Sequence, residues 1–194
     1  MASKIEICNM ALANLGAALI NQLTEGSPEA RYCRLNFDHA RDAVLRDHPW
    51  NFAARRESLA LLSTTPRGFA YAYQYPTDCV RALSIWKSIP TADPIPFEVQ
   101  AKSGGGKQIN TDEADAVLEY TARVTEEGQY DDSFVDALAW RLAAAIAMPL
   151  TKSLPIMQAM MTVYENRMAQ AAAMDGQEGR KDPEYTSSWI QARL

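Results

Sequence analysis

The sequence HPWNFA, residues 48–53, marks the point at which a helical pattern gives way to an extended one. Proline at position 49 disfavours helix in the residue before it, so the preceding helix should end near His48. Trp50 and Phe52 follow directly, and two bulky rings at such a corner would anchor the chain to a helical core as it turns towards a sheet. We therefore interpret Pro49, Trp50 and Phe52 as a structural corner.

Two helices are predicted on the N-terminal side of this corner. Ser3 and Glu6 have the spacing of a capping box, and Gly16 offers a place for that helix to end. Ser27-Pro28 is a second start signal, because proline fits the first position of a helix. The second helix carries an apolar stripe of Ala30, Cys33, Phe37, Ala40 and Val44.

The segment from Asn51 to Val124 favours strands. Aromatic residues alternate with smaller or polar ones between residues 69 and 75, which places four rings (Phe69, Tyr71, Tyr73 and Tyr75) on one face. The run Gly104 to Gly106 predicts the tip of a hairpin. We expect a small antiparallel sheet of about four strands, drawn from this alternating segment and from Val80–Trp86, Phe97–Ala101, Lys107–Thr111 and Ala116–Val124.

Helices return after Asp131-Asp132-Ser133, three residues that suit a helix N-cap. Pro149 should end or kink this third helix, and Ser153 with Pro155 should start a fourth that continues to Gly176. The two predicted stripes are Phe134, Leu138, Leu142 and Ala145, and then Met157, Met161, Tyr164, Met168 and Ala171.

The expected fold is α+β and mainly α: a helical bundle with an inserted small antiparallel β-sheet and an extended C-terminal arm. We predict the bundle over residues 1–62 and 130–176, the insertion over 63–129 and the arm over 177–194. The arm is polar with a few spaced apolar residues, so these should pack back on the domain or dock on another protein.

Composition argues against several classes of protein. The chain has 194 residues and a net charge of −5, which is not the footprint of a protein that grips nucleic acid phosphates. The apolar-leaning run from Ile7 to Leu19 is too short for a membrane span, so we expect no membrane partner. Three widely spaced cysteines favour reduced thiols. Arginines between Arg31 and Arg67 are balanced by acids, including a predicted Asp42–Arg46 ion pair.

We find no credible active site in the sequence, and we expect a protein that is not an enzyme and needs no cofactor or metal. Gly104 to Lys107 lacks the other residues of a phosphate-binding loop. His39 and His48 have no partners at zinc-ligand spacing. The acid pairs at 112–113, 126–127 and 131–132 are better explained by turns and helix caps than by catalysis.

A series of short motifs runs along the chain in a fixed order. They are Asn9, Ala11-Leu12, Leu15-Gly16, Leu23-Thr24-Glu25, Glu29-Ala30, Cys33, Arg41-Asp42, Leu45-Arg46, residues 48–53, Tyr73 to Pro76, Asp78 to Arg81, Phe134, Ala137 to Ala139, Leu142 to Ala144, and Trp189 to Arg193. In order and length they resemble the tail tubular protein A family of short-tailed bacteriophages. The resemblance is densest over residues 5–86 and weakest over 87–115.

This resemblance implies a head-to-tail adaptor in the virion neck, present in the host cytoplasm during assembly. Such proteins form a dodecameric ring between the portal protein and the tail nozzle protein, and genomic DNA passes through the channel without sequence-specific binding. The arm would then contact the portal or a neighbouring subunit, and the candidate contacts are Tyr185, Trp189, Ile190, Arg193 and Leu194.

Two alternatives come from other classes of protein. One is a non-enzymatic α+β module that binds a partner through the methionine-rich closing helix, since methionine adapts to irregular surfaces. The other is a hydrolase of cell-wall polymer, for which the acids at 126–127 and 131–132 are the only candidates.

Overall fold

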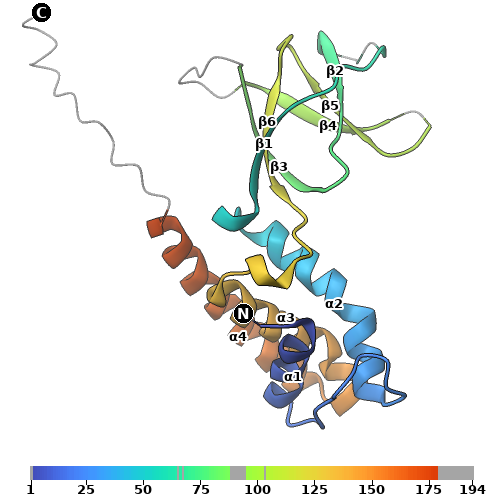
Figure 1. The fold of residues 1–194 in the computed structure, drawn as a ribbon, viewed down its shortest axis with the longest axis vertical. Coiled ribbons are helices and arrows are strands. Elements are labelled where there is room, and N and C mark those ends of the chain that lie inside the picture. Colours follow the sequence, from blue (N-terminus) through green and yellow to red (C-terminus); the bar gives the residue numbers. More distant parts are fainter. Residues whose placement is uncertain (1, 65, 67, 88–94, 103, 179–194) are drawn as a thin grey trace, which may run out of the picture.

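The computed structural model describes residues 2–64, 66, 68–87, 95–102 and 104–178, and within them four helices form one part of the molecule and six strands the other (Figure 1). The fold is α+β and mainly α, as predicted. The helices are α1 (Lys4–Asn14), α2 (Pro28–Asp47), α3 (Asp132–Thr151) and α4 (Leu154–Glu178), with short 3-10 turns at Asn51–Ala53 and Glu127–Gln129. The strands are β1 (Ala54–Ser58), β2 (Tyr71–Gln74), β3 (Cys79–Trp86), β4 (Phe97–Ala101), β5 (Lys107–Thr111) and β6 (Val117–Ala122).

The first two helices begin where their capping residues predict. The Ser3 hydroxyl accepts a hydrogen bond from the Glu6 N–H at 3.2 Å, and the Glu6 carboxylate accepts one from the Ser3 N–H at 2.6 Å. These bonds satisfy backbone donors that the first turn leaves free, and they hold the pKa of Glu6 below its ordinary value. Gly16, at φ +66°, follows the end of α1. Ser27 caps α2, which ends at Asp47, just before the corner.

α3 is the central helix of the bundle and packs against α1, α2 and α4. By length and composition α3 could cross a membrane. However, 56% of its most apolar stretch is buried inside the protein, and packing between the other helices accounts for its apolar character. Phe134, Leu138 and Leu142 are fully buried as predicted, whereas Ala145 is exposed and the predicted stripe was wrong at that position. Pro149 lies in the last turn, close to the end of the helix.

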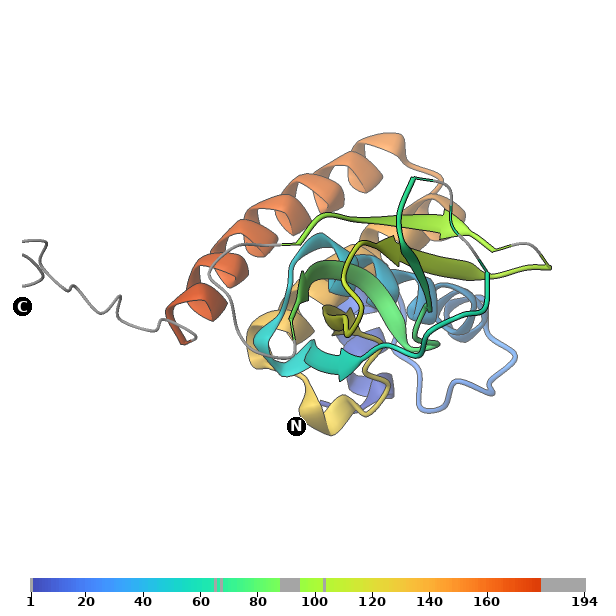
Figure 2. The same ribbon diagram turned by 90° about the horizontal axis from the view of Figure 1, so that it is seen from above.

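The strands form two three-stranded antiparallel sheets, in the orders β1-β6-β3 and β2-β5-β4. The expectation of one small sheet of about four strands was therefore wrong. The two sheets share a core that includes Tyr73, Ile85, Ile109 and Leu118. Tyr71 and Tyr75 pack against this core, which confirms the predicted aromatic face for three of its four rings, whereas Phe69 lies before β2 and is not part of this cluster. The hairpin of β4 and β5 has the predicted bounds, and the three glycines at its tip all have positive φ (Figure 2).

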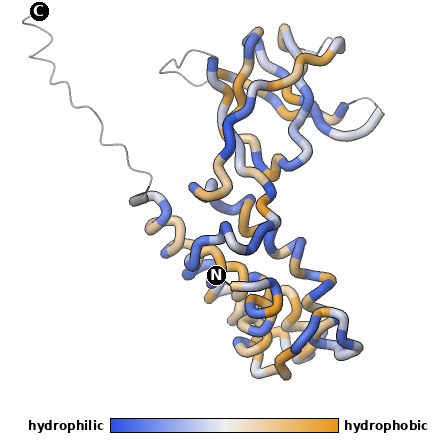
Figure 3. Tube along the Cα trace, in the orientation of Figure 1, coloured by the Kyte–Doolittle hydropathy of each residue, from blue (hydrophilic) through white to orange (hydrophobic). Residues whose placement is uncertain are grey.

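The strands also begin earlier than the boundary predicted at residue 63. β1 starts at Ala54, directly after the corner, and pairs with β6 from Ala54↔Thr121 to Ser58↔Val117. Its sequence is ARRES and all five residues are exposed, so it shows no alternation of apolar and polar residues. Four of these five residues are polar or charged, and hydrophilic stretches are visible in the strand region (Figure 3). At the other end, α4 runs past the predicted end at residue 176 to Glu178.

All three cysteines are buried and none of them forms a disulfide. Cys8 and Cys33 face each other between α1 and α2, where a hydrogen bond to Cys33 and burial both raise the pKa of the Cys8 thiol. These thiols belong to the core, as the sequence indicated.

Candidate functional site

From the sequence we predicted candidate partner contacts in the C-terminal arm and a structural corner at Pro49, Trp50 and Phe52. The arm contacts lie outside the described residues, which end with α4 at Glu178; they are Tyr185, Trp189, Ile190, Arg193 and Leu194. The corner lies within them, at the junction between the helices and the strands (Figure 1).

Trp50 occupies the centre of this junction. Its side chain is fully buried, its indole N–H donates a hydrogen bond to the Val44 carbonyl at 3.0 Å, and its ring meets that of Phe134 edge-on at 5.1 Å. Phe52 also packs against Phe134, with ring centroids 5.1 Å apart, while Pro49 is exposed. The corner therefore fastens the end of α2 to the start of α3.

The return connection from the strands uses the same aromatic cluster. Tyr130, just before α3, lies 4.8 Å from Phe134 and 6.0 Å from Phe52 between ring centroids. Its hydroxyl donates to the Val124 carbonyl at 3.0 Å, and burial raises the pKa of Tyr130 to about 12. The connection from α2 to β1 and the connection from β6 to α3 therefore both pack against Phe134.

Asp175 joins the end of α4 to the corner, a contact that the sequence did not reveal. It is only 5% exposed, although we predicted it near the start of a polar arm. Its carboxylate lies 2.8 Å from His48 Nε2 and accepts the Asn51 N–H at 3.1 Å. The Asn51 side-chain amide donates to the Asp175 carbonyl at 2.7 Å. We call Asp175, His48 and Asn51 the α4 anchor.

Three arginines connect the strands to α2. Arg46 donates to the Val80 carbonyl at 3.0 Å, and Arg81 donates to the Arg46 carbonyl at 3.1 Å. Arg123 pairs with Asp42 at 2.9 Å. The predicted Asp42–Arg46 pair is not formed, because Asp42 binds Arg41 and Arg123 and the Arg46 side chain reaches across to β3. Asp38 of α2 forms ion pairs with Arg41 of the same helix and with Lys4 of α1.

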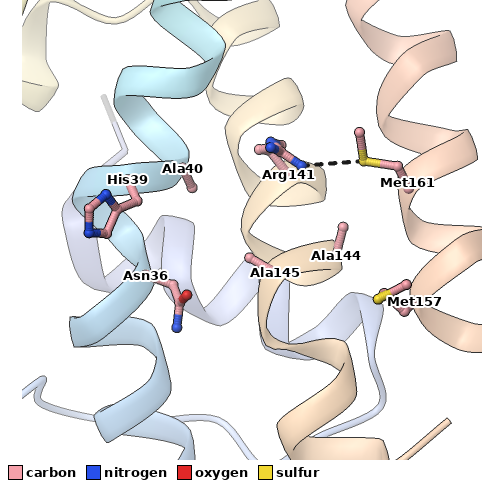
Figure 4. Close-up of a pocket in the computed structure, with 8 residues that line it drawn as sticks. All are labelled: Asn36, His39, Ala40, Arg141, Ala144, Ala145, Met157 and Met161. Carbon is pink, nitrogen blue, oxygen red and sulfur yellow. Dashed lines mark hydrogen bonds between the residues drawn. The ribbon is translucent and has the colours of Figure 1, made fainter. Parts of the chain in front are cut away.

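An apolar groove of about 430 Å³ runs over α3 between α2 and α4 (Figure 4). Ala144 and Ala145 line it from α3, Met157 and Met161 from α4, and His39 from α2. The Arg141 guanidinium projects into this groove, donates to the Met161 sulfur at 3.3 Å and lies 5.5 Å from the Tyr164 ring. Met157 and Met161 are partly exposed in this groove, so part of the methionine-rich helix is accessible to a partner.

The acids considered for catalysis lie in two places. Asp131 and Asp132 line a recess of about 320 Å³ together with Ser133, Met174 and Asp175. Glu126 and Glu127 do not line it and belong to the turn before α3. In the part of the chain that the structure describes, no three acidic, histidine or cysteine side chains lie close enough to hold a metal ion.

No protein-family model matches this chain, and no curated protein matches it either.

Proposed function

We propose that this protein is a structural head-to-tail adaptor of the tail tubular protein A type, which forms a ring between the portal and the tail nozzle of a short-tailed phage. The main support for this proposal is that several of the motifs shared with that family lie together in the structure. Residues 48–53 contact Phe134, and Arg46 binds Val80, so motifs far apart in the chain share one junction. These motifs jointly fix how the helices meet the strands, and a subunit of a regular ring needs such a fixed shape.

The two-part architecture also suits a ring. Subunits in a head-to-tail ring need two different patches, one on each side, and separate helical and β parts can supply them. The aromatic cluster and the arginines of α2 hold these parts in a fixed relation. Each subunit would then present its surfaces at the same angle to its neighbours.

Charge supports a channel that DNA passes through rather than one that binds it. The chain has a net charge of −5, and several arginines of α2 and its neighbours are engaged within the molecule. A surface that does not neutralise phosphates releases no counterions, so DNA would slide past it with little affinity. In this proposal the protein works in the virion neck after assembly in the host cytoplasm.

Retention of the protein on the immobilised portal ring of the same virus tests the proposed contact with the portal. We expect stoichiometric retention of the full chain, and a loss of at least tenfold in affinity for a chain that ends at Glu178. Trp189→Ala should give an intermediate loss, with Arg180→Ala as a matched control within the arm. Failure of the full chain to bind the portal across salt concentrations would contradict the adaptor role.

One observation favours a second candidate function. The groove lined by Met157 and Met161 resembles a helix-binding surface, so a partner-binding module remains the alternative. Such a module would form a small complex of fixed stoichiometry with its partner and would not assemble into rings, which separates it from the adaptor.

A further inference from the structure

The two sheets have four outer edges, and among the described residues the chain itself pairs along the edge of β2 and at one position of β3. The edge of β2 is covered by residues 60–62, through hydrogen bonds from Leu62 N–H to the Ala72 carbonyl at 2.8 Å and from Gln74 N–H to the Ala60 carbonyl at 2.9 Å. The edge of β3 receives Ile95, which bridges to Ile85. Among the residues that the structure describes, no backbone segment pairs with the outer edges of β1 and β4.

Unpaired strand edges are templates for another strand. β1 and β4 are each five residues long, all of β1 is exposed, and Val99 at the middle of β4 is 39% exposed. The two edges lie on opposite sides of the strand region (Figure 2). One open edge on each side is the arrangement that a head-to-tail contact between identical subunits needs.

Each edge carries one charged side chain that has no partner of opposite sign among the described residues, while the other charges of β1, Arg56 and Glu57, bond to Glu119 and Tyr120 of β6. On β1, Arg55 is exposed, and its guanidinium donates only to the main-chain carbonyls of Phe52 and Ala54 among the described residues. On β4, Glu98 is exposed and receives a hydrogen bond from Gln100, with no cation paired to it in the described part of the chain. Opposite charges on neighbouring strands stabilise pairing, and like charges oppose it.

We propose that β1 of one copy pairs with β4 of the next copy, so that the β1-β6-β3 sheet of one subunit continues into the β2-β5-β4 sheet of its neighbour. Arg55 and Glu98 face each other across this contact. The inference rests on the proposed ring and adds to it the surface through which neighbouring subunits bind.

Cysteine crosslinking tests the contact directly. The variant with both Arg55→Cys and Glu98→Cys should give, when the ring assembled on the portal is mildly oxidised, a ladder of covalent oligomers on a non-reducing gel. The native cysteines are buried and should not contribute. The matched control joins Glu98→Cys to Leu19→Cys, an exposed position in the helical part that should give no ladder.

Each single variant separates head-to-tail pairing from pairing of like edges. Arg55→Cys or Glu98→Cys alone should stay monomeric on the gel, and a covalent dimer from either would overturn the proposal. A complete ring that gives no ladder with the double variant would also overturn it, while leaving the adaptor role intact. Absence of any assembly on the portal would overturn both.

Charge reversal gives a second readout that does not depend on disulfide geometry. Arg55→Glu and Glu98→Arg should each weaken self-association about tenfold, and the combined variant should recover most of that loss. Both side chains are exposed, so thermal melting should be unchanged in all three proteins. Additive losses in the combined variant would contradict the pairing of these two residues.

Discussion

Trp50 fills the junction between α2 and α3 with its whole indole ring, and it has no exposed surface. Replacing a large buried aromatic residue by alanine leaves a cavity that the neighbours fill only in part. We expect Trp50→Ala to lower the free energy of unfolding by about 3–5 kcal/mol. Urea denaturation measures this, with exposed Leu35→Ala as a control. An unchanged melting temperature together with failed assembly would show that Trp50 serves an interface instead.

Asp175 is the residue that orients the end of α4. Asp175→Ala would leave the His48 ring and the Asn51 N–H without their acceptor in a partly buried place. A cost of about 1–3 kcal/mol is expected for such a loss. Hydrogen exchange should also rise over the last turns of α4. Asn166→Ala, exposed on the same helix, is the control, and equal effects of the two variants would contradict a specific anchor.

The structural role of Trp50 could be predicted from the sequence, whereas that of Asp175 could not. The motif HPWNFA places two aromatic rings directly after a helix-ending proline, so a local pattern identifies the corner. The anchor joins residues 127 positions apart, and a lone aspartate before a glycine has the composition of a loop. Only the packing of α4 against the bundle brings Asp175 to His48.

Glu119 ties together the three strands of the β1-β6-β3 sheet. Its carboxylate accepts hydrogen bonds from Ser84 at 2.8 Å and from Trp86 at 2.7 Å, and it pairs with Arg56 at 3.2 Å. Burial acts to raise the pKa of Glu119, but these partners outweigh burial and hold it below its ordinary value of 4.5. The folded state therefore binds this proton less readily than the unfolded state does.

The stabilisation from Glu119 should accordingly be fully present above pH 4.5 and be lost as the pH falls through the lower pKa of the folded state. We expect Glu119→Gln to cost about 1–2 kcal/mol at neutral pH, and the difference from the wild type to shrink at acidic pH. Thermal melts between pH 7 and pH 3 check this, with exposed Glu126→Gln as the control. A difference that does not change with pH would contradict the network.

Among the elements, the helices and the β4–β5 hairpin were predictable, whereas β1 was not. Capping residues and apolar stripes define helix ends locally, and the three glycines mark the hairpin tip. β1 has only exposed residues, so it lacks the alternation of apolar and polar residues that marks a strand. It is a strand because it pairs with β6, which lies far away in the sequence. The same exposure that concealed β1 in the sequence makes it a candidate contact with a neighbour.

The whole molecule, in the proposed function, acts as one repeated subunit of a ring. The order of helices, strands and helices indicated two parts, but no sequence pattern shows that β1 and β4 lie on opposite sides of the strand region. That placement depends on how the two sheets cross and on the cluster around Trp50 and Phe134. The candidate groove likewise brings α2 together with α3 and α4, which lie far from it in the chain.

Sedimentation velocity on the protein alone, and on its mixture with the portal ring of the same virus, tests the adaptor role most directly. We predict a species whose mass equals that of the portal ring plus about twelve copies of the 21.5 kDa chain. A free monomer beside an unaltered portal ring, at every salt concentration tried, would contradict the account.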